Sequence, residues 1–189
     1  MDYIFSLTGT VLYDDPRTLL RTLWKDETRA LRLYTLVFES PEWRMLTEGS
    51  VKREEALEWL CRRTPEEADH IRLALKYWPR CLTPRWETVA LLLDMKSQNR
   101  GLYFYAETAA DGKEHIHKTY PFMTLFEGGL FSCDGQAPPP YTELCRLYNL
   151  APSHCFWVDT SRERVRAAET EGLRGVLFTN AERLRDSLI

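Results

Sequence analysis

The sequence predicts an α/β protein in which a doubly wound parallel sheet carries a small all-helical insertion after its first strand. In the C-terminal half, short apolar runs of strand length alternate with helical patterns. This alternation is typical of right-handed crossovers between parallel strands. Residues 15–84 instead show one helical pattern after another, with no strand pattern among them. A chain of 189 residues has room for a single core with a modest insertion.

The first element is an apolar strand that ends in a glycine turn. Ile4 and Phe5 lie in a β-prone run, residues 6–10 are Ser-Leu-Thr-Gly-Thr, and Pro16 then opens a helical pattern. A strand that runs into a glycine turn directs backbone N–H groups toward the sheet edge, where parallel α/β proteins usually bind ligands. An ordinary core strand followed by a turn explains the same residues, because one glycine turn is a weak signal.

Helical periodicity predicts several helices in the insertion. One continuous helical pattern covers residues 16–34, and Ser40 and Ser50 are candidate N-caps of the helices that follow it. Thr64 opens a further helix with an apolar stripe at helical spacing. The members of this stripe are Ala68, Ile71, Leu75 and Trp78. Four aromatic residues of the insertion suit either its own core or a surface for a protein partner, namely Trp43, Trp59, Tyr77 and Trp78.

The second half of the chain alternates strands with helices. The predicted strands are residues 102–106, 130–133, 154–158 and 175–178. The predicted helices are residues 83–97, 141–149, 161–171 and 180–188. In the first of these helices, we expect the inner face to consist of Trp86, Val89, Ala90 and Leu93. Residues 109–112 are typical of a turn, and residues 113–126 show no clear pattern.

Composition and charge narrow the classes of partner. The net charge is −3 and there is no long basic run, so we expect neither nucleic acid nor a membrane as a partner. The longest apolar runs are far too short to span a bilayer. No basic segment precedes the apolar stretch at the N-terminus, so this stretch does not resemble a signal peptide.

The cysteines and histidines do not indicate a metal site or a disulfide framework. The 5 cysteines are scattered and form no CxxC pair, which favours free thiols in a reducing cytoplasm. His115 and His117 alternate as in a strand or loop, and neither has a carboxylate or cysteine at ligand spacing. We therefore interpret both histidines as surface residues rather than metal ligands.

The first fifteen residues resemble the opening motif of the haloacid dehalogenase-like (HAD) phosphohydrolases. That motif is an apolar strand followed by Asp-x-Asp-Gly-Thr and an apolar residue, and residues 9–11 here are Gly-Thr-Val. Both aspartates of the motif are missing. Ser6 stands at the position of the family's nucleophile and Thr8 at that of its acid/base. The resemblance implies a Rossmann-like core in which Gly9 still belongs to a ligand-binding turn.

The second and third motifs of the family also lack their functional side chains. The resemblance implies a serine or threonine at the end of the second core strand, where this chain has Ala106, followed by Glu107 and Thr108. A shift in alignment would bring in Thr108, but a carboxylate at Glu107 would then repel a phosphate. The third motif implies a lysine, and this chain has Ala137 at that position. Lys113 and Lys118 lie earlier and lack the sequence context of the family's lysine.

The fourth motif is a strand that ends in two acidic residues which hold magnesium. Here the strand ends in Asp159 and Thr160, so one acidic residue remains. An N-cap role beside Ser161 explains Asp159 equally well. Magnesium in proteins usually needs one or two carboxylates together with substrate phosphate, and Ser6 contributes none. Serine is also a weak nucleophile without a nearby base, and no histidine lies near Ser6 in the sequence.

These features predict a catalytically degenerate HAD-like protein, that is, a pseudoenzyme that binds a small ligand or a protein partner. Its core would comprise residues 1–14 and 85–189, and residues 15–84 would form a helical cap. The expected ligand-binding residues are Ser6, Thr8, Gly9, Ala106, Glu107, Thr108, Asp159 and Thr160. We expect no catalytic residue and no metal site. The alternative is a hydrolase of small phosphate esters with a rewired site, and only this alternative requires Mg²⁺.

Overall fold

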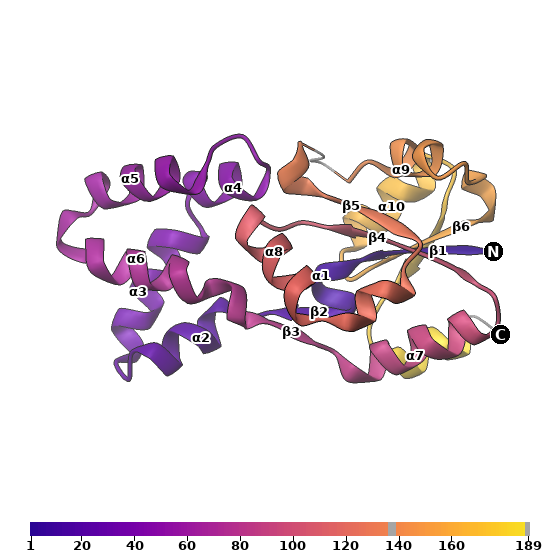
Figure 1. Ribbon diagram of the computed structural model, residues 1–189, viewed down its shortest axis with the longest axis horizontal. Helices are drawn as coiled ribbons and strands as arrows, with labels where there is room; N and C mark the ends of the chain where they lie inside the picture. The colour runs from indigo at the N-terminus through magenta and orange to yellow at the C-terminus, as the bar shows by residue number, and fades with distance from the viewer. Residues whose placement is uncertain (136–138, 188–189) are drawn as a thin grey trace.

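The computed structural model describes residues 1–135 and 139–187, and its centre is a five-stranded parallel sheet (Figure 1). The strand order is β5-β4-β1-β6-β7, with every neighbouring pair parallel. The strands are β1 (Asp2–Ser6), β4 (Gly101–Ala106), β5 (Gly128–Phe131), β6 (Cys155–Asp159) and β7 (Arg174–Leu177). The α/β class and the parallel sheet predicted from the sequence are therefore confirmed.

Helices cover both faces of this sheet, as a doubly wound fold requires. Tyr3 and Phe5 of β1 point into one apolar cluster, whereas Ile4 between them points into another. Residues of α7, α8 and α11 join the first cluster, and residues of α9 and α10 join the second. These helices are α7 (Trp86–Ser97), α8 (Ala110–Thr119), α9 (Tyr141–Leu147), α10 (Arg162–Thr170) and α11 (Ala181–Ser187).

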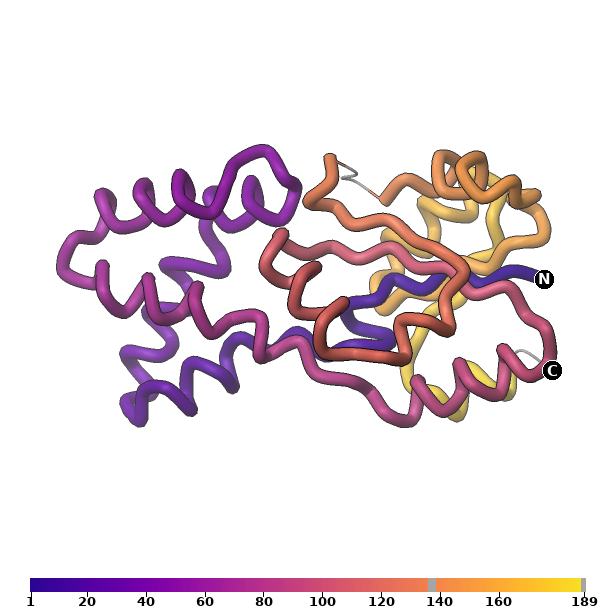
Figure 2. The backbone as a smooth tube through the Cα atoms, in the orientation of Figure 1, coloured from indigo at the N-terminus to yellow at the C-terminus, as the bar shows by residue number. Residues whose placement is uncertain are grey.

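A two-stranded antiparallel ribbon joins the sheet to the inserted helices. The chain leaves the core through β2 (Leu12–Asp14) and returns beside it through β3 (Leu82–Pro84), as the tube in Figure 2 shows. Five α-helices lie between these strands, at the opposite end of the molecule from the N-terminus (Figure 1). They are α2 (Pro16–Leu23), α3 (Glu27–Phe38), α4 (Pro41–Thr47), α5 (Arg53–Arg63) and α6 (Ala68–Tyr77). We call residues 16–81 the helical insertion.

Capping residues explain where the helices of the insertion begin. The predicted helix over residues 16–34 is in fact two helices, because the Asp26 side chain accepts a hydrogen bond from the Arg29 amide and starts α3. Ser40 caps α4 as predicted, since its hydroxyl accepts from the Trp43 amide at 3.0 Å. The prediction of Ser50 as an N-cap is wrong. Helix α5 begins at Arg53, where the Glu55 carboxylate accepts the Lys52 amide.

Two expectations for the core helices are also wrong. Trp86 and Leu93 are exposed at 66% and 54%, and α7 instead buries Val89, Leu92 and Met95. The run of apolar residues from 89 to 93 offers more than one possible inner face, so periodicity alone could not select the right one. Residues 109–112 are not a turn, because α8 begins at Ala110. His115 and His117 consequently lie on a helix rather than on a strand or loop.

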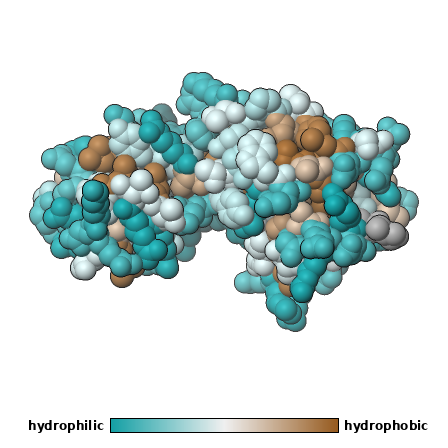
Figure 3. Space-filling view, turned by 90° about the horizontal axis from the view of Figure 1, so that it is seen from below, coloured by the Kyte–Doolittle hydropathy of each residue, from teal (hydrophilic) through white to brown (hydrophobic). Residues whose placement is uncertain are grey.

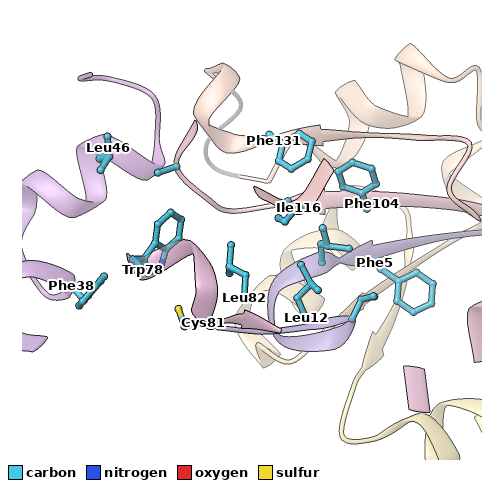
Figure 4. Close-up of a cluster of buried hydrophobic side chains, with 14 of the residues drawn as sticks. Phe5, Leu12, Phe38, Leu46, Trp78, Cys81, Leu82, Phe104, Ile116 and Phe131 are labelled. Atoms are coloured by element: carbon cyan, nitrogen blue, oxygen red, sulfur yellow. The ribbon is translucent and has the colours of Figure 1, made fainter. Parts of the chain in front are cut away.

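One apolar cluster extends from the helical insertion to the sheet (Figure 4). Trp78, at the end of the insertion, is 2% exposed and packs edge-on against Trp43 at 4.7 Å between ring centroids. Leu82 and Leu12 of the connecting ribbon continue the cluster toward Phe5. Tyr77 is half-buried and Trp59 is exposed at 39%. Shared burial on this scale ties the orientation of the helical insertion to that of the sheet.

The surface of the molecule is mixed in character. From below, apolar residues gather over the sheet-bearing part and over smaller areas of the helical insertion, with polar residues around them (Figure 3). Across residues 1–135 and 139–187, none of the helices has the length and apolar content needed to cross a bilayer.

Gly112 lies where α8 contacts the end of the helical insertion. A methyl group at this position would come within 2.2 Å of Thr108 Oγ1 and 2.5 Å of Trp78 Cη2. An alanine in a helix usually stabilises by about 0.5–1 kcal/mol relative to glycine. We expect Gly112→Ala to do the opposite and lower the free energy of unfolding by about 1–3 kcal/mol through overpacking. Urea unfolding of the two proteins measures this difference.

The control for this prediction removes the nearest obstacle. Thr108 Oγ1 is buried without a hydrogen-bond partner among the described residues, so Thr108→Ala leaves no donor or acceptor unpaired. The double variant Thr108→Ala/Gly112→Ala should therefore recover part of the lost stability. A Gly112→Ala protein at least as stable as the wild type would contradict the close packing of α8 on Trp78.

Candidate functional site

The carboxyl ends of three adjacent strands bring most of the predicted site residues to one edge of the sheet. Ser6 ends β1 and lies in register with Tyr105 of β4. On the other side, Phe5 pairs with Val158, so Asp159 follows beside Ser6 at the end of β6. Side chains alternate along a strand, which puts Ser6 on the same face of the sheet as Ile4. Ser6 and Asp159 thus lie next to each other on neighbouring strands.

A tight turn follows Ser6. The Thr10 hydroxyl donates to the Ser6 carbonyl at 2.6 Å and closes the turn. Thr8 is extended, and Gly9 has a φ of 94°, which favours glycine because other residues are strained there. A Cβ atom on Gly9 would lie 3.0 Å from Thr160 Oγ1. This close approach brings the turn after β1 against the end of β6.

The Ser6 side chain has no activating partner. The residue is 1% exposed, and its Oγ forms no hydrogen bond with any described residue. A serine nucleophile needs a base within hydrogen-bond reach to take its proton. Within the described part of the chain, no histidine, carboxylate or lysine occupies that position.

The carboxylate of Asp159 accepts a hydrogen bond at each oxygen from its own segment. Asp159 is 1% exposed, its Oδ2 accepts the indole N–H of Trp157 at 3.2 Å, and its Oδ1 accepts the Ser161 amide at 2.9 Å. The Ser161 hydroxyl in turn accepts the Arg164 amide and caps α10. These contacts make Asp159 the residue that shapes the turn from β6 into α10.

The segment after β4 turns only one polar side chain toward this edge. Ala106 is fully buried and offers no hydroxyl. Thr108 Oγ1 faces Gly112 and Trp78, and the Thr108 amide donates to Ser132 Oγ at 3.0 Å. Glu107 is therefore the member of the predicted trio that reaches the open space above the strand ends.

A cleft of about 830 Å³ lies at this edge. Of the residues predicted from the sequence, it is lined by Thr8, Glu107, Asp159 and Thr160. Sequence reasoning missed its other functional groups, which are Glu48, Tyr105, Tyr141, Glu163 and Arg164. Glu48 belongs to the helical insertion, so the cleft is bounded by the core on one side and by the insertion on the other.

Arg164 is the cationic group among the described residues that line the cleft. Its guanidinium forms an ion pair with the Glu107 carboxylate across the strand ends. Burial opposes the charge of Arg164, but the carboxylates of Glu107 and Asp159 outweigh this effect and raise the pKa of the guanidinium. The sequence does contain a signal for its position. Ser161 is a recognisable N-cap directly after the strand, and Arg164 follows three residues later, in the first turn of α10.

The lysine that the third motif implies is not replaced by either candidate. Ala137 lies outside the described residues. Lys113 binds the carboxylate of Asp134 at 2.7 Å, and Lys118 pairs with Glu114 on the same face of α8. Neither lysine lines the cleft. Within the described part of the chain, no cluster of three or more His, Cys, Asp or Glu side chains could hold a metal ion.

Comparisons with known proteins find similar structures but no match by sequence. No protein-family model matches the chain, and no curated protein matches it. A HAD family enzyme from Bacteroides thetaiotaomicron, solved with magnesium and inorganic phosphate, is similar to it with a TM-score of 0.71 and 14% identity. The match covers 94% of this chain and 93% of that chain. The chain has the HAD-like fold.

Two further solved structures are similar to this chain. A HAD phosphatase from Thermococcus onnurineus matches at a TM-score of 0.67 and 15% identity, over 99% of this chain and 97% of that chain. The L-2-haloacid dehalogenase of Xanthobacter autotrophicus, with chloropropionic acid covalently bound, matches at 0.62 and 15% identity, over 91% and 74%. The HAD-like fold thus agrees with the order of strand, helical insertion and further α/β units in the sequence.

Proposed function

We propose that this chain is a catalytically degenerate HAD-like protein that acts as a small-ligand-binding or regulatory module. The observation that carries the proposal is the environment of Ser6. At the position where the resemblance implies the nucleophile, the structure has a buried hydroxyl with no hydrogen-bond partner among the described residues. A scaffold that keeps its fold and its cleft without an activated nucleophile supports binding rather than turnover.

The residues at the strand ends do not suit magnesium. Mg²⁺ takes oxygen ligands in near-octahedral geometry and usually binds through one or two carboxylates together with substrate phosphates. At the positions of the family's motifs, Ser6 and Thr160 leave Asp159 as the one carboxylate, and each of its oxygens also accepts a hydrogen bond, from Trp157 or from Ser161. The arrangement of acidic groups gives no metal-binding cluster within residues 1–135 and 139–187. We infer that the module works without a metal cofactor.

The helical insertion is proposed to act as the cap of this module. In this division, residues 1–14 and 85–189 form the core and residues 15–84 form the cap, and Glu48 brings the cap to the cleft. A ligand in the cleft would contact both parts, and a protein partner could sense their arrangement. The free thiols of the described cysteines fit a cytoplasmic location.

A second candidate function is a hydrolase of small phosphate esters with a rewired site. The structural neighbours favour this alternative, because they include a HAD phosphatase and a HAD family enzyme with bound magnesium and phosphate. In this case Ser6, Thr8, Asp159 and Thr160 would line the reaction site, and Mg²⁺ would be required.

A phosphatase assay separates the two functions. We expect no turnover of p-nitrophenyl phosphate or of small sugar phosphates above background, with or without millimolar Mg²⁺. The matched control is Ser6→Ala, which removes an unpartnered hydroxyl and should leave the fold intact. Turnover by the wild type that disappears in Ser6→Ala would overturn the proposed function and establish the hydrolase. Equal background in both proteins would support the binding role.

A further inference from the structure

We propose that the cleft binds an extended organic polycation, an aliphatic chain that carries two or more ammonium groups, rather than a phosphate. This inference rests on the proposed function, because it assigns a ligand class to the same cleft. It is carried by the balance of charge in the lining, by the placement of the acidic groups, and by two tyrosines of the lining with an unpaired hydroxyl buried beside them.

The charge of the lining is inverted relative to a phosphate site. Four acidic residues face the cleft and one cationic residue does so. The cation, Arg164, is already neutralised by Glu107. Glu48 and Glu163 form no ion pair with any described residue. A phosphate would meet uncompensated carboxylates here, whereas an ammonium group would be attracted to them.

The acidic groups are too widely spread for a single point charge. They come from the end of α4, the ends of β4 and β6, and the first turn of α10, and no three of them could hold one metal ion within the described part of the chain. A ligand with several charges separated by methylene groups can satisfy Glu48 and Glu163 at the same time. The spacing therefore favours a polyamine over a divalent cation.

The floor of the cleft suits both the methylene groups and the charges of such a ligand. Tyr105 and Tyr141 line it, and Trp157 packs behind them, with ring centroids 4.6 Å from Tyr141 and 6.1 Å from Tyr105. Aromatic faces bind alkyl chains and attract cations. Burial and the nearby Glu107 carboxylate raise the pKa of Tyr105, which keeps its phenol neutral.

Ser6 is the second, independent sign of a ligand. Its hydroxyl is buried and has no hydrogen-bond partner among the described residues. Ser6 is not itself a lining residue, but it lies beneath the lining, on the strand face shared by Tyr105 and Asp159, which both line the cleft. A buried polar group without a partner is costly unless something satisfies it. An N–H group of a bound amine can donate to this oxygen.

The test is calorimetric titration of the full-length protein with spermidine at low ionic strength. We expect binding by the wild type that weakens by about tenfold or more in Glu48→Gln/Glu163→Gln, since two carboxylates without an ion-pair partner among the described residues are lost. Arg164→Gln frees Glu107, so this variant should bind spermidine several-fold more tightly, on the order of the effect of one charge. Binding should also weaken as salt is raised.

The matched control is Glu182→Gln, which removes an exposed carboxylate on α11 away from the cleft. Spermidine affinity should be unchanged in this variant. Equal weakening in Glu182→Gln and in the cleft variant would mean non-specific attraction and would overturn the inference. Circular dichroism of each variant establishes that the fold is retained.

The same proteins distinguish failure of the inference from failure of the proposed function. No heat of binding with spermidine, together with no phosphoester turnover, overturns the polycation site and leaves the non-catalytic role in place. Tight binding of inorganic phosphate in place of spermidine also overturns it. Turnover that depends on Ser6 overturns the proposed function, whatever spermidine does. Spermidine binding that follows the cleft carboxylates supports both.

Discussion

Replacing Ser132 by alanine should lower the free energy of unfolding by about 2–4 kcal/mol, because it leaves two buried backbone groups without partners. Ser132 is fully buried. Its hydroxyl donates to the Thr47 carbonyl at 2.6 Å and accepts from the Thr108 amide at 3.0 Å. One oxygen atom thus joins the end of α4 in the helical insertion to the segment after β4.

Loss of the Ser132 hydrogen bonds should also loosen the contact between the helical insertion and the core. Near this hydroxyl, Gly49 packs so closely on Cys133 that a Cβ atom would lie 2.3 Å from the Cys133 carbonyl oxygen. With Ser132→Ala, we expect faster amide hydrogen exchange at Thr108 and in α4, where the tie is lost, and little change in β6. Urea unfolding measures the stability and hydrogen exchange locates the change.

Ser97→Ala is the matched control for Ser132→Ala. The Ser97 hydroxyl also donates to a backbone carbonyl, that of Asp94 at 2.7 Å, but it is exposed to water at the end of α7. Water replaces its contact, so we expect a change within about 0.5 kcal/mol. Similar effects of the two variants would show that the Ser132 hydrogen bonds do not hold the insertion to the core.

The fold was largely predictable because its strands carry a strong local signal. The runs that become β4 and β6 are apolar apart from Asp159 at the end of β6, which is the pattern of parallel strands buried on both faces. The inner face of α7 was not predictable, because its consecutive apolar residues fit more than one orientation and the packing of Val89 and Leu92 against the sheet decides it. The prediction of Ser50 as an N-cap was wrong because α5 is instead capped at Lys52, two residues later.

The site was predictable only where it depends on the sheet. Strand register alone brings Ser6 beside Asp159, so their proximity follows from the order of the strands. The approach of Glu48 depends on how the helical insertion packs on the core, which no local pattern encodes. The Thr108 side chain faces Gly112 instead of the cleft, and this orientation also depends on tertiary packing. The inverted charge of the cleft therefore becomes visible only in three dimensions.

Trp157→Ala should be among the most destabilising single substitutions in the core, lowering the free energy of unfolding by about 3–5 kcal/mol. Trp157 is fully buried in the middle of β6, and its ring meets that of Tyr141 edge-on at 4.6 Å. Its removal would leave a large cavity under the floor of the cleft. It would also take the indole donor away from Asp159 Oδ2. Urea unfolding gives the size of the effect.

Two further variants separate the cavity from the hydrogen bond. Trp157→Phe keeps much of the packing but removes the indole N–H, so it should cost about 1–3 kcal/mol, the usual effect of leaving a buried acceptor unpaired. Trp86→Ala removes a tryptophan that is 66% exposed, and we expect a change within about 0.5 kcal/mol. If Trp157→Phe matched the wild type, the indole would not be what holds the Asp159 carboxylate. The Ser161 amide would then be the remaining contact of the two described for that carboxylate, and the case for a binding module without magnesium would be weaker.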